Sequence, residues 1–153
     1  MKTEIERKFL TANDGWRAQT SGSIAMKQGY VPRAKGCATV RVRLAGEQAF
    51  LTIKGPTHGI SRAEFEYPIP VGDAEIMLKE LCGNLVEKTR WLVPFGGRVW
   101  EVDEFHGENA GLVVAELELS GAEETYERPP WLGEEVSGDP RSFNSFLARL
   151  PYR

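Results

Sequence analysis

The sequence contains few of the residues that build zinc sites and disulfide frameworks. Its 153 residues include two cysteines, Cys37 and Cys82, and two histidines, His58 and His106. The cysteines lie too far apart in the sequence to form a paired metal or redox motif, so we expect no zinc site. Two free thiols are typical of a reducing compartment, and we therefore predict a cytoplasmic protein.

Long apolar runs and a strong excess of one charge are also missing. No stretch approaches the roughly 18 apolar residues of a membrane span, and the N-terminus is charged from Lys2 onward. The formal net charge of −3 gives no sign of a nucleic-acid partner. We therefore expect neither a membrane nor a nucleic acid as partner. A content of 41% hydrophobic and 27% charged residues fits one folded domain over residues 1–153.

The first residues that invite a functional interpretation form a charged strand at residues 3–10. Alternation along a strand places Glu4, Glu6 and Lys8 on one face. Two carboxylates about 7 Å apart repel by roughly 2 kcal/mol at an effective dielectric constant near 20. A divalent cation between them would convert that cost into a binding site. One such strand is usually a solvent-exposed face, so the interpretation depends on whether the pattern recurs.

The remaining chain predicts mainly β structure of the α+β class. Alternating patterns and turn residues predict strands at 24–31, 38–44, 50–54, 61–69, 85–93, 98–105 and 112–119. Asp14 is expected to cap a short helical turn. A helix is expected at 73–82, with an apolar stripe of Ala74, Met77, Leu78 and Leu81. A C-terminal helix should begin at Asp139–Pro140, bury Phe143, Phe146, Leu147 and Leu150, and end at Pro151. The hairpin spacing favours an eight-stranded antiparallel β-barrel with a few peripheral helices.

Charged pairs of like sign recur on single faces of the predicted strands. They are Arg41 with Arg43, Glu64 with Glu66, Lys88 with Arg90, Glu101 with Asp103, and Glu116 with Glu118. Repetition of this electrostatic cost indicates a barrel with a charged interior, to which Lys27, Lys54 and Arg62 add cations. Buried charges persist only when they are paired or bind a ligand. Carboxylates suit Mg²⁺ or Mn²⁺, and an Arg-x-Arg pair suits phosphate, so the interior predicts a polyphosphate ligand with divalent cations.

The order of these motifs resembles the CYTH superfamily, the triphosphate tunnel metalloenzymes, and especially its short bacterial inorganic triphosphatases. The matching motifs are Glu4-x-Glu6-x-Lys8, Arg41-x-Arg43, Lys54, Glu64-x-Glu66, Lys88-Thr89-Arg90, Asp103 and Glu116-x-Glu118. Gln28-Gly29-Tyr30 and residues 130–136 also match the short members. The resemblance covers nearly the whole chain. It implies an eight-stranded antiparallel tunnel that binds a triphosphate inside.

The resemblance also implies a role for each motif residue. Glu4, Glu6 and Glu118 would hold a catalytic Mg²⁺ or Mn²⁺, with Glu116 close by. Phosphate oxygens would be bound by Lys8, Arg41, Arg43, Lys54, Lys88 and Arg90, and the charged-face argument adds Lys27 to this set. Asp103 and Glu66 would be second-metal ligands or would orient the basic residues. Lys88 would act as a base if burial and Arg90 depress its pKa, and otherwise as a phosphate ligand. For Arg62, Glu64 and Glu101 the sequence leaves open whether their role is structural or functional.

The expected activity is metal-dependent hydrolysis of inorganic tripolyphosphate to diphosphate and phosphate. Two alternatives within the family, a class IV adenylyl cyclase and a thiamine triphosphatase, need space for an organic group that the short loops do not offer. A third alternative is a polyphosphate- or nucleotide-binding module without catalysis. The carboxylates argue against it, because a pure anion binder gains nothing from acids beside its ligand. The sequence leaves the oligomeric state open, and the resemblance to short family members makes a homodimer one candidate.

Overall fold

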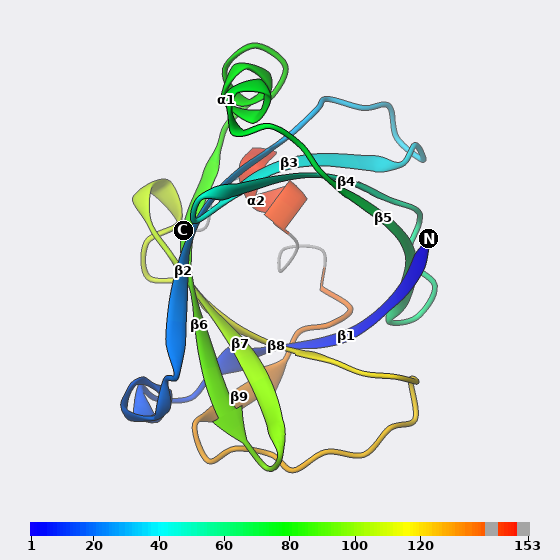
Figure 1. Ribbon diagram of the computed structural model, residues 1–153. Helices are drawn as coiled ribbons and strands as arrows, with labels where there is room; N and C mark the ends of the chain where they lie inside the picture. Colours follow the sequence, from blue (N-terminus) through cyan, green and yellow to red (C-terminus); the bar gives the residue numbers. More distant parts are fainter. Residues whose placement is uncertain (140–143, 150–153) are drawn as a thin grey trace.

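The computed structural model describes residues 1–139 and 144–149, and its central feature is a ring of antiparallel strands (Figure 1). The strands are β1 (Lys2–Thr11), β2 (Gly22–Tyr30), β3 (Thr39–Ala45), β4 (Gln48–Lys54), β5 (Ser61–Pro68), β6 (Val86–Phe95), β7 (Arg98–Phe105), β8 (Val113–Glu118) and β9 (Leu132–Glu135). The helices are α1 (Val71–Glu80) and α2 (Asn144–Arg149), with short 3₁₀ turns η1 (Gly15–Gln19) and η2 (Gly107–Asn109). The eight predicted strands are all present.

Strand β1 closes the ring because its two edges pair with different partners. Its residues 6–10 pair with β8, and its residues 2–5 pair with β5. The remaining order runs β5-β4-β3-β2-β6-β7-β8, with every neighbouring pair antiparallel. The prediction of an eight-stranded antiparallel barrel is confirmed, and the structure shows that the barrel is closed. Closure places Glu4 beside β5, and Glu6 and Lys8 beside β8.

The ninth strand, β9, was not predicted. It pairs with the last part of β1, where Phe9 lies opposite Glu135 and Thr11 opposite Leu132. The strand is four residues long, without strict alternation, so its sequence carries little strand signal. A side chain at Gly133 would meet the Leu10 carbonyl oxygen at 2.8 Å, so this close approach requires a glycine.

The largest apolar cluster packs outside the barrel, because the charged residues occupy much of its interior. Phe9, Trp100 and Leu117 belong to this cluster, which Trp16 and Trp131 complete from the segments around it. Trp100 meets both Phe9 and Trp131 edge to face, with ring centroids 5.7 Å apart in each pair. Alternation along the strands thus directs the paired charged side chains into the barrel and the aromatic side chains of this cluster outward.

One end of the barrel interior is apolar, which the sequence did not indicate. Val86 lies on the same face of its strand as Lys88, and Val114 on the same face as Glu116, so both continue the inner surface. They form a buried cluster with Phe105, Leu147 and Ala148. The last two residues come from α2, which lies within the outline of the ring in Figure 1 and contacts β2 and β6. Helix α2 therefore docks on the apolar end of the interior.

Helix α1 packs on the outer face of β3 and β4, near the top of Figure 1. It begins at Val71, two residues before the predicted start, and buries Ala74 and Leu78 as expected. Leu81 was predicted in the buried stripe, but it follows the last helical residue and is 54% exposed. The predicted Phe143 and Leu150, and the predicted limits at Pro140 and Pro151, lie outside the described residues. No helix among the described residues has the length and apolarity that a membrane crossing requires.

Candidate active site

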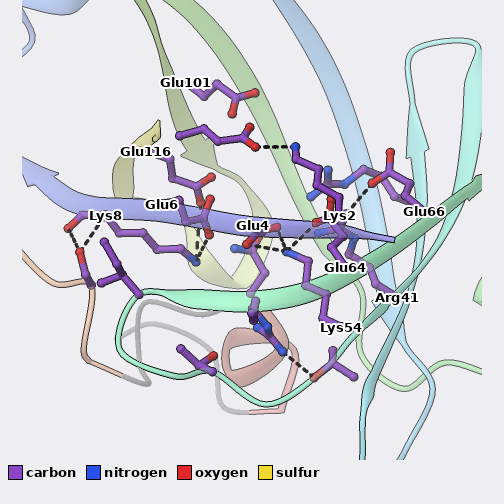
Figure 2. Close-up of a pocket in the computed structure, with 18 of the residues that line it drawn as sticks. Lys2, Glu4, Glu6, Lys8, Arg41, Lys54, Glu64, Glu66, Glu101 and Glu116 are labelled. Atoms are coloured by element: carbon purple, nitrogen blue, oxygen red, sulfur yellow. Dashed lines mark hydrogen bonds and ion pairs between the residues drawn. The ribbon is translucent and has the colours of Figure 1, made fainter. Parts of the chain in front are cut away.

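A cavity of about 270 Å³ inside the barrel is lined by most of the charged residues predicted to face inward (Figure 2). These are Glu4, Glu6, Lys8, Arg41, Arg43, Lys54, Arg62, Glu64, Glu66, Lys88, Arg90, Glu101, Glu116 and Glu118. Seven of the eight barrel strands contribute at least one of them, and β2 contributes none. Residues scattered over the sequence are thus brought together by barrel closure. Lys27 and Asp103 are not part of the lining.

The prediction that Lys27 faces the interior is wrong. Its side chain is 47% exposed and lies 3.9 Å from Glu87 on the neighbouring strand. The opposite face of β2 points inward, where Gln28 is completely buried. Strand β2 carries a single charge and no repeated pattern to fix its orientation, so sequence alternation alone did not identify its inner face. This placement does not support a role for Lys27 in phosphate binding.

The carboxylates gather on three neighbouring strands. Glu6 on β1 lies directly opposite Glu118 on β8, and Glu116 on β8 lies opposite Glu101 on β7. Residues in such cross-strand pairs have Cβ atoms about 5 Å apart, so their side chains reach a common region. Glu118 pairs with Lys2 at the more exposed side of this group. These strands form an acidic wall of the cavity, defined here as Glu6, Glu101, Glu116 and Glu118.

Two lysines lie among the carboxylates (Figure 2). The Lys8 Nζ atom is 3.7 Å from an oxygen of Glu6 and 3.7 Å from an oxygen of Glu116. Burial lowers the pKa of Lys8, but Glu116 and Glu6 outweigh it and the pKa is raised overall. The Lys54 Nζ atom donates hydrogen bonds of 3.1 and 2.8 Å to the two oxygens of Glu4. Lys8 therefore remains cationic at neutral pH.

A buried trio on β6 and β7 provides further cations. The Lys88 Nζ atom donates to Asp103 Oδ2 at 2.6 Å, and Arg90 binds both Asp103 oxygens at 2.8 and 2.9 Å. Asp103 is completely buried, and its two oxygens are occupied by three donors. Asp103 is not part of the cavity lining, so its placement does not support a role as metal ligand. The structure favours the other expected role, in which Asp103 orients Lys88 and Arg90.

The members of the trio have strongly perturbed pKa values because they are buried and lie close to one another's charges. Burial raises the pKa of Asp103, but Arg90 and Lys88 outweigh it and hold the pKa well below its usual range. Burial, aided by the charges of Arg90 and Arg43, lowers the pKa of Lys88 to about 7, although Asp103 opposes the shift. The direction agrees with the expectation from burial and Arg90. Lys88 therefore titrates near neutral pH, unlike Lys8.

The second cationic group comes from β3. Arg41 donates to Thr52 at 3.3 Å and lies 3.7 Å from Glu66, while its buried Nε atom has no partner among the described residues. Arg43 donates to Gln28 at 2.8 Å and forms no ion pair within the described part of the chain. Burial, followed by the charges of Arg41 and Arg90, lowers the pKa of Arg43. At neutral pH Arg43 is still protonated, so its charge is available to an anion.

Glu66 lies at the rim of this region, where its side chain is 40% exposed. It accepts a hydrogen bond from Thr52 and lies beside Arg41. Several uncharged lining residues were not predicted as site residues, namely Tyr30, Thr39, Thr57, Ile60, Ser137 and Asn144. Charge patterns alone selected the predicted site, and such patterns do not report neutral residues. Gln28-Gly29-Tyr30 was noted only as a family motif.

The acidic wall has the donor chemistry of a site for a divalent cation. Carboxylate oxygens are the ligands that Mg²⁺ and Mn²⁺ prefer, and the cross-strand pair of Glu6 and Glu118 supplies four of them. Glu4 and Glu116 flank this pair. Within residues 1–139 and 144–149, no three acidic, histidine or cysteine side chains converge into a ready-made cluster. Several of these carboxylates are instead paired with lysines, which a divalent cation would have to replace.

Comparison with known proteins identifies relatives across the whole chain. The CYTH domain family model matches residues 2–143. A protein named inorganic triphosphatase from Acetivibrio thermocellus is 46% identical over 154 residues, covering 100% of this chain and 97% of that protein. A second inorganic triphosphatase, from Nitrosomonas europaea, is 36% identical over 151 residues, covering 95% and 97% respectively.

A solved structure supports the same relationship. The crystal structure of the inorganic triphosphatase NE1496 superimposes with a TM-score of 0.68 at 33% sequence identity. The superposition covers 97% of this chain and 95% of that one. Sequence and three-dimensional comparisons thus agree over the same span.

Proposed function

The chain belongs to the CYTH domain family, and on that basis we propose that it hydrolyses inorganic tripolyphosphate to diphosphate and phosphate. One observation carries the proposal: the barrel holds a polar cavity whose lining combines buried cations with an acidic wall. The cations suit a linear polyanion, and the acids suit the divalent cations that accompany it. The relatives named inorganic triphosphatase support this assignment.

The size and lining of the cavity favour an inorganic substrate. At about 270 Å³ it lies below the roughly 300–1,000 Å³ of sites for larger organic ligands. Apart from Tyr30 and Ile60, its lining residues are charged or otherwise polar, so an adenosine or thiamine group would find little apolar surface. These features favour tripolyphosphate over the substrates of an adenylyl cyclase or a thiamine triphosphatase.

Phosphate oxygens would be bound by cations from four strands. Arg41 and Arg43 approach from β3, Lys88 and Arg90 from β6, Lys54 from β4 and Lys8 from β1. Phosphoryl transfer depends mainly on positioning and on neutralising negative charge, and buried cations do both more strongly than exposed ones. Asp103 fixes Lys88 and Arg90 so that little reorganisation is needed when substrate binds.

Triphosphatases of this family generally depend on a metal ion. We propose that Glu4, Glu6 and Glu118 hold Mg²⁺ or Mn²⁺, with Glu116 beside them and Glu66 as a further acidic residue at the rim. When bound there, such an ion would supply Lewis acidity and would activate a water. Glu4 must exchange its hydrogen bonds with Lys54 for this role, which frees Lys54 to turn toward a phosphate oxygen.

Lys88 combines phosphate binding with proton exchange. Its pKa of about 7 means that the free enzyme holds both ammonium and neutral amine near neutral pH. A bound polyanion favours the ammonium form, so Lys88 binds phosphate as a cation. Only the neutral amine could accept a proton from an attacking water, so the role as a base and the role as a phosphate ligand belong to different protonation states, and the bound polyanion favours the phosphate ligand.

The proposed function is tested by phosphate release from tripolyphosphate, ATP and thiamine triphosphate in parallel, each with Mg²⁺, Mn²⁺ or EDTA. We expect rapid release from tripolyphosphate with a divalent cation, little release from the organic triphosphates, and none with EDTA. Cyclic AMP formation from ATP would instead identify an adenylyl cyclase. Tight tripolyphosphate binding without release under any metal condition would identify a binding module.

A further inference from the structure

Two buried amide side chains connect the cations of the cavity with helix α2. Arg43 Nε donates to Gln28 Oε1 at 2.8 Å. Gln28 Nε2 donates to the Tyr30 hydroxyl at 2.9 Å and to Asn144 Oδ1 at 3.2 Å. Lys88 Nζ donates to the same Asn144 oxygen at 3.0 Å. A continuous path of hydrogen bonds therefore runs from β3 through β2 and α2 to β6.

The orientation of both amides follows from the two cations at the ends of this path. Arginine and lysine have donors and no acceptors, so the amide atom that faces each of them must be an oxygen. With the Gln28 oxygen toward Arg43, its NH₂ group points to Asn144. The Asn144 oxygen then accepts from Gln28 and Lys88 together. Each hydrogen bond in the path requires the others to keep this direction.

Neutral partners have a specific advantage beside an anion site. A carboxylate at either amide position would also hold the cations, but it would cancel charge that a phosphate chain needs. Arg43 forms no ion pair within the described residues, and Lys88 shares its single carboxylate, Asp103, with Arg90. Amides hold both side chains in place without cancelling any further positive charge. Leaving buried donors without partners would instead be costly.

We propose that Gln28 and Asn144 are positioning residues for the phosphate-binding cations Arg43 and Lys88, an inference that rests on the proposed triphosphatase function. Asn144 is the first residue of α2, and α2 is seated by Leu147 and Ala148 on the apolar end of the barrel. Docking of α2 therefore gives Lys88 a second hydrogen-bond partner besides Asp103. The helix that covers this end of the interior also completes the cationic surface.

The first test compares Asn144→Leu with Asn144→Asp. Leucine has a similar volume and removes the acceptor, whereas aspartate keeps an oxygen acceptor at the same place and adds negative charge. In Asn144→Leu we expect kcat for tripolyphosphate to fall about 10- to 100-fold, because small displacements of a positioned group have effects of this order. In Asn144→Asp we expect kcat to recover toward wild type while KM rises, because the added charge repels the substrate.

A stability control separates positioning from general loss of structure. Leu78→Ala removes a buried side chain from α1, outside the barrel and away from the amides. It should lower Tm but leave kcat within about twofold of wild type, because most molecules remain folded at the assay temperature. A wild-type kcat in Asn144→Leu would overturn the inference. Equal losses in the leucine and aspartate variants, without the difference in KM, would overturn it too.

A second readout does not depend on turnover. ¹⁵N NMR of the lysine ammonium groups at pH 6, with the Lys88 signal assigned through Lys88→Arg, reports whether Lys88 is held by hydrogen bonds. We expect a protected Lys88 signal in wild type and Asn144→Asp, and fast proton exchange in Asn144→Leu. An unchanged Lys88 signal in Asn144→Leu would overturn the inference. If wild type releases no phosphate, the proposed function fails, and this spectrum alone decides whether Asn144 positions Lys88.

Discussion

Replacing Asp103 by asparagine changes one charge at the centre of the buried trio while keeping the shape of the side chain. The carboxylate now accepts three hydrogen bonds, from Lys88 at 2.6 Å and from Arg90 at 2.8 and 2.9 Å. The asparagine amide offers one oxygen and one NH₂ group, and that NH₂ group must face a donor of Lys88 or Arg90. The two buried cations would then share one acceptor oxygen in place of two.

The expected cost is large because both cations are largely buried. The Lys88 side chain is 0% exposed, and that of Arg90 is 11% exposed. Removal of one partner from a buried ion pair typically costs about 3–5 kcal/mol, and we expect the free energy of unfolding to fall by that amount. The pKa of Asp103 lies well below its usual range, so its contribution is complete above about pH 4 and declines as the pH falls further. In Asp103→Asn, the free energy of unfolding should therefore lack this decline at acid pH.

Urea unfolding at pH 7, followed by the fluorescence of the four tryptophans, measures the difference. Glu104→Gln is a matched control on the same strand, because Glu104 pairs with the more exposed Arg17 on the outer face. An exposed pair contributes about 1 kcal/mol or less. If Asp103→Asn lowers the free energy of unfolding no more than Glu104→Gln does, the buried ion pairs of Asp103 do not stabilise the fold as expected. The reasoning from burial and hydrogen bonding is then refuted.

Three further predictions address the cavity directly. Glu6→Ala should lower kcat for tripolyphosphate by at least about 100-fold with little change in the urea midpoint, and full activity would remove Glu6 from the metal site. At pH 8, tripolyphosphate binding should take up close to one more proton in wild type than in Lys88→Arg, because free Lys88 has a pKa of about 7 that the polyanion raises. Calorimetry in buffers of different ionisation enthalpy measures this proton uptake. Equal uptake in the two proteins would contradict the pKa assigned to Lys88. Lys27→Ala should leave kcat and KM unchanged, because Lys27 lies on the outer face beside Glu87, and a severalfold rise in KM would argue against that placement.

Much of the barrel could be predicted because two opposing periodic patterns occur on the same strands. In β3, for example, Arg41 and Arg43 alternate with Val40 and Val42, and a period of two can only be read as a strand with two different faces. Repulsion between like charges on one face then suggested an enclosed site. This reasoning identifies the face that carries the charges, and closure of the ring makes that face the interior.

The same reasoning failed where a strand lacks a charge pattern or where a contact depends on distant segments. Gln28, not Lys27, faces inward on β2, and a single neutral amide gives no periodic signal. For Asp103 the sequence left two roles open, and its hydrogen bonds with Lys88 and Arg90 favour the one in which it orients these cations. Asn144 reaches the cavity from 56 residues beyond Lys88, a separation that local patterns do not resolve.

The apolar end of the interior illustrates a further limit. Val86 lies on the same strand face as Lys88, and Val114 on the same face as Glu116. The sequence therefore does not show where along each strand the charged part of the interior ends. Their burial depends on α2, which packs Leu147 against them. A short helix near the C-terminus gives no sequence signal for the surface on which it docks. Tertiary packing thus decides where the charged cavity ends.

The central claim is that the charged barrel is a metal-dependent site for an inorganic triphosphate. The most direct test is the ratio of kcat/KM for tripolyphosphate to kcat/KM for ATP, measured with saturating Mg²⁺ or Mn²⁺ and repeated with excess EDTA. We predict a ratio far above one and complete loss of turnover in EDTA. A ratio near or below one, or turnover that persists in EDTA, would contradict the account.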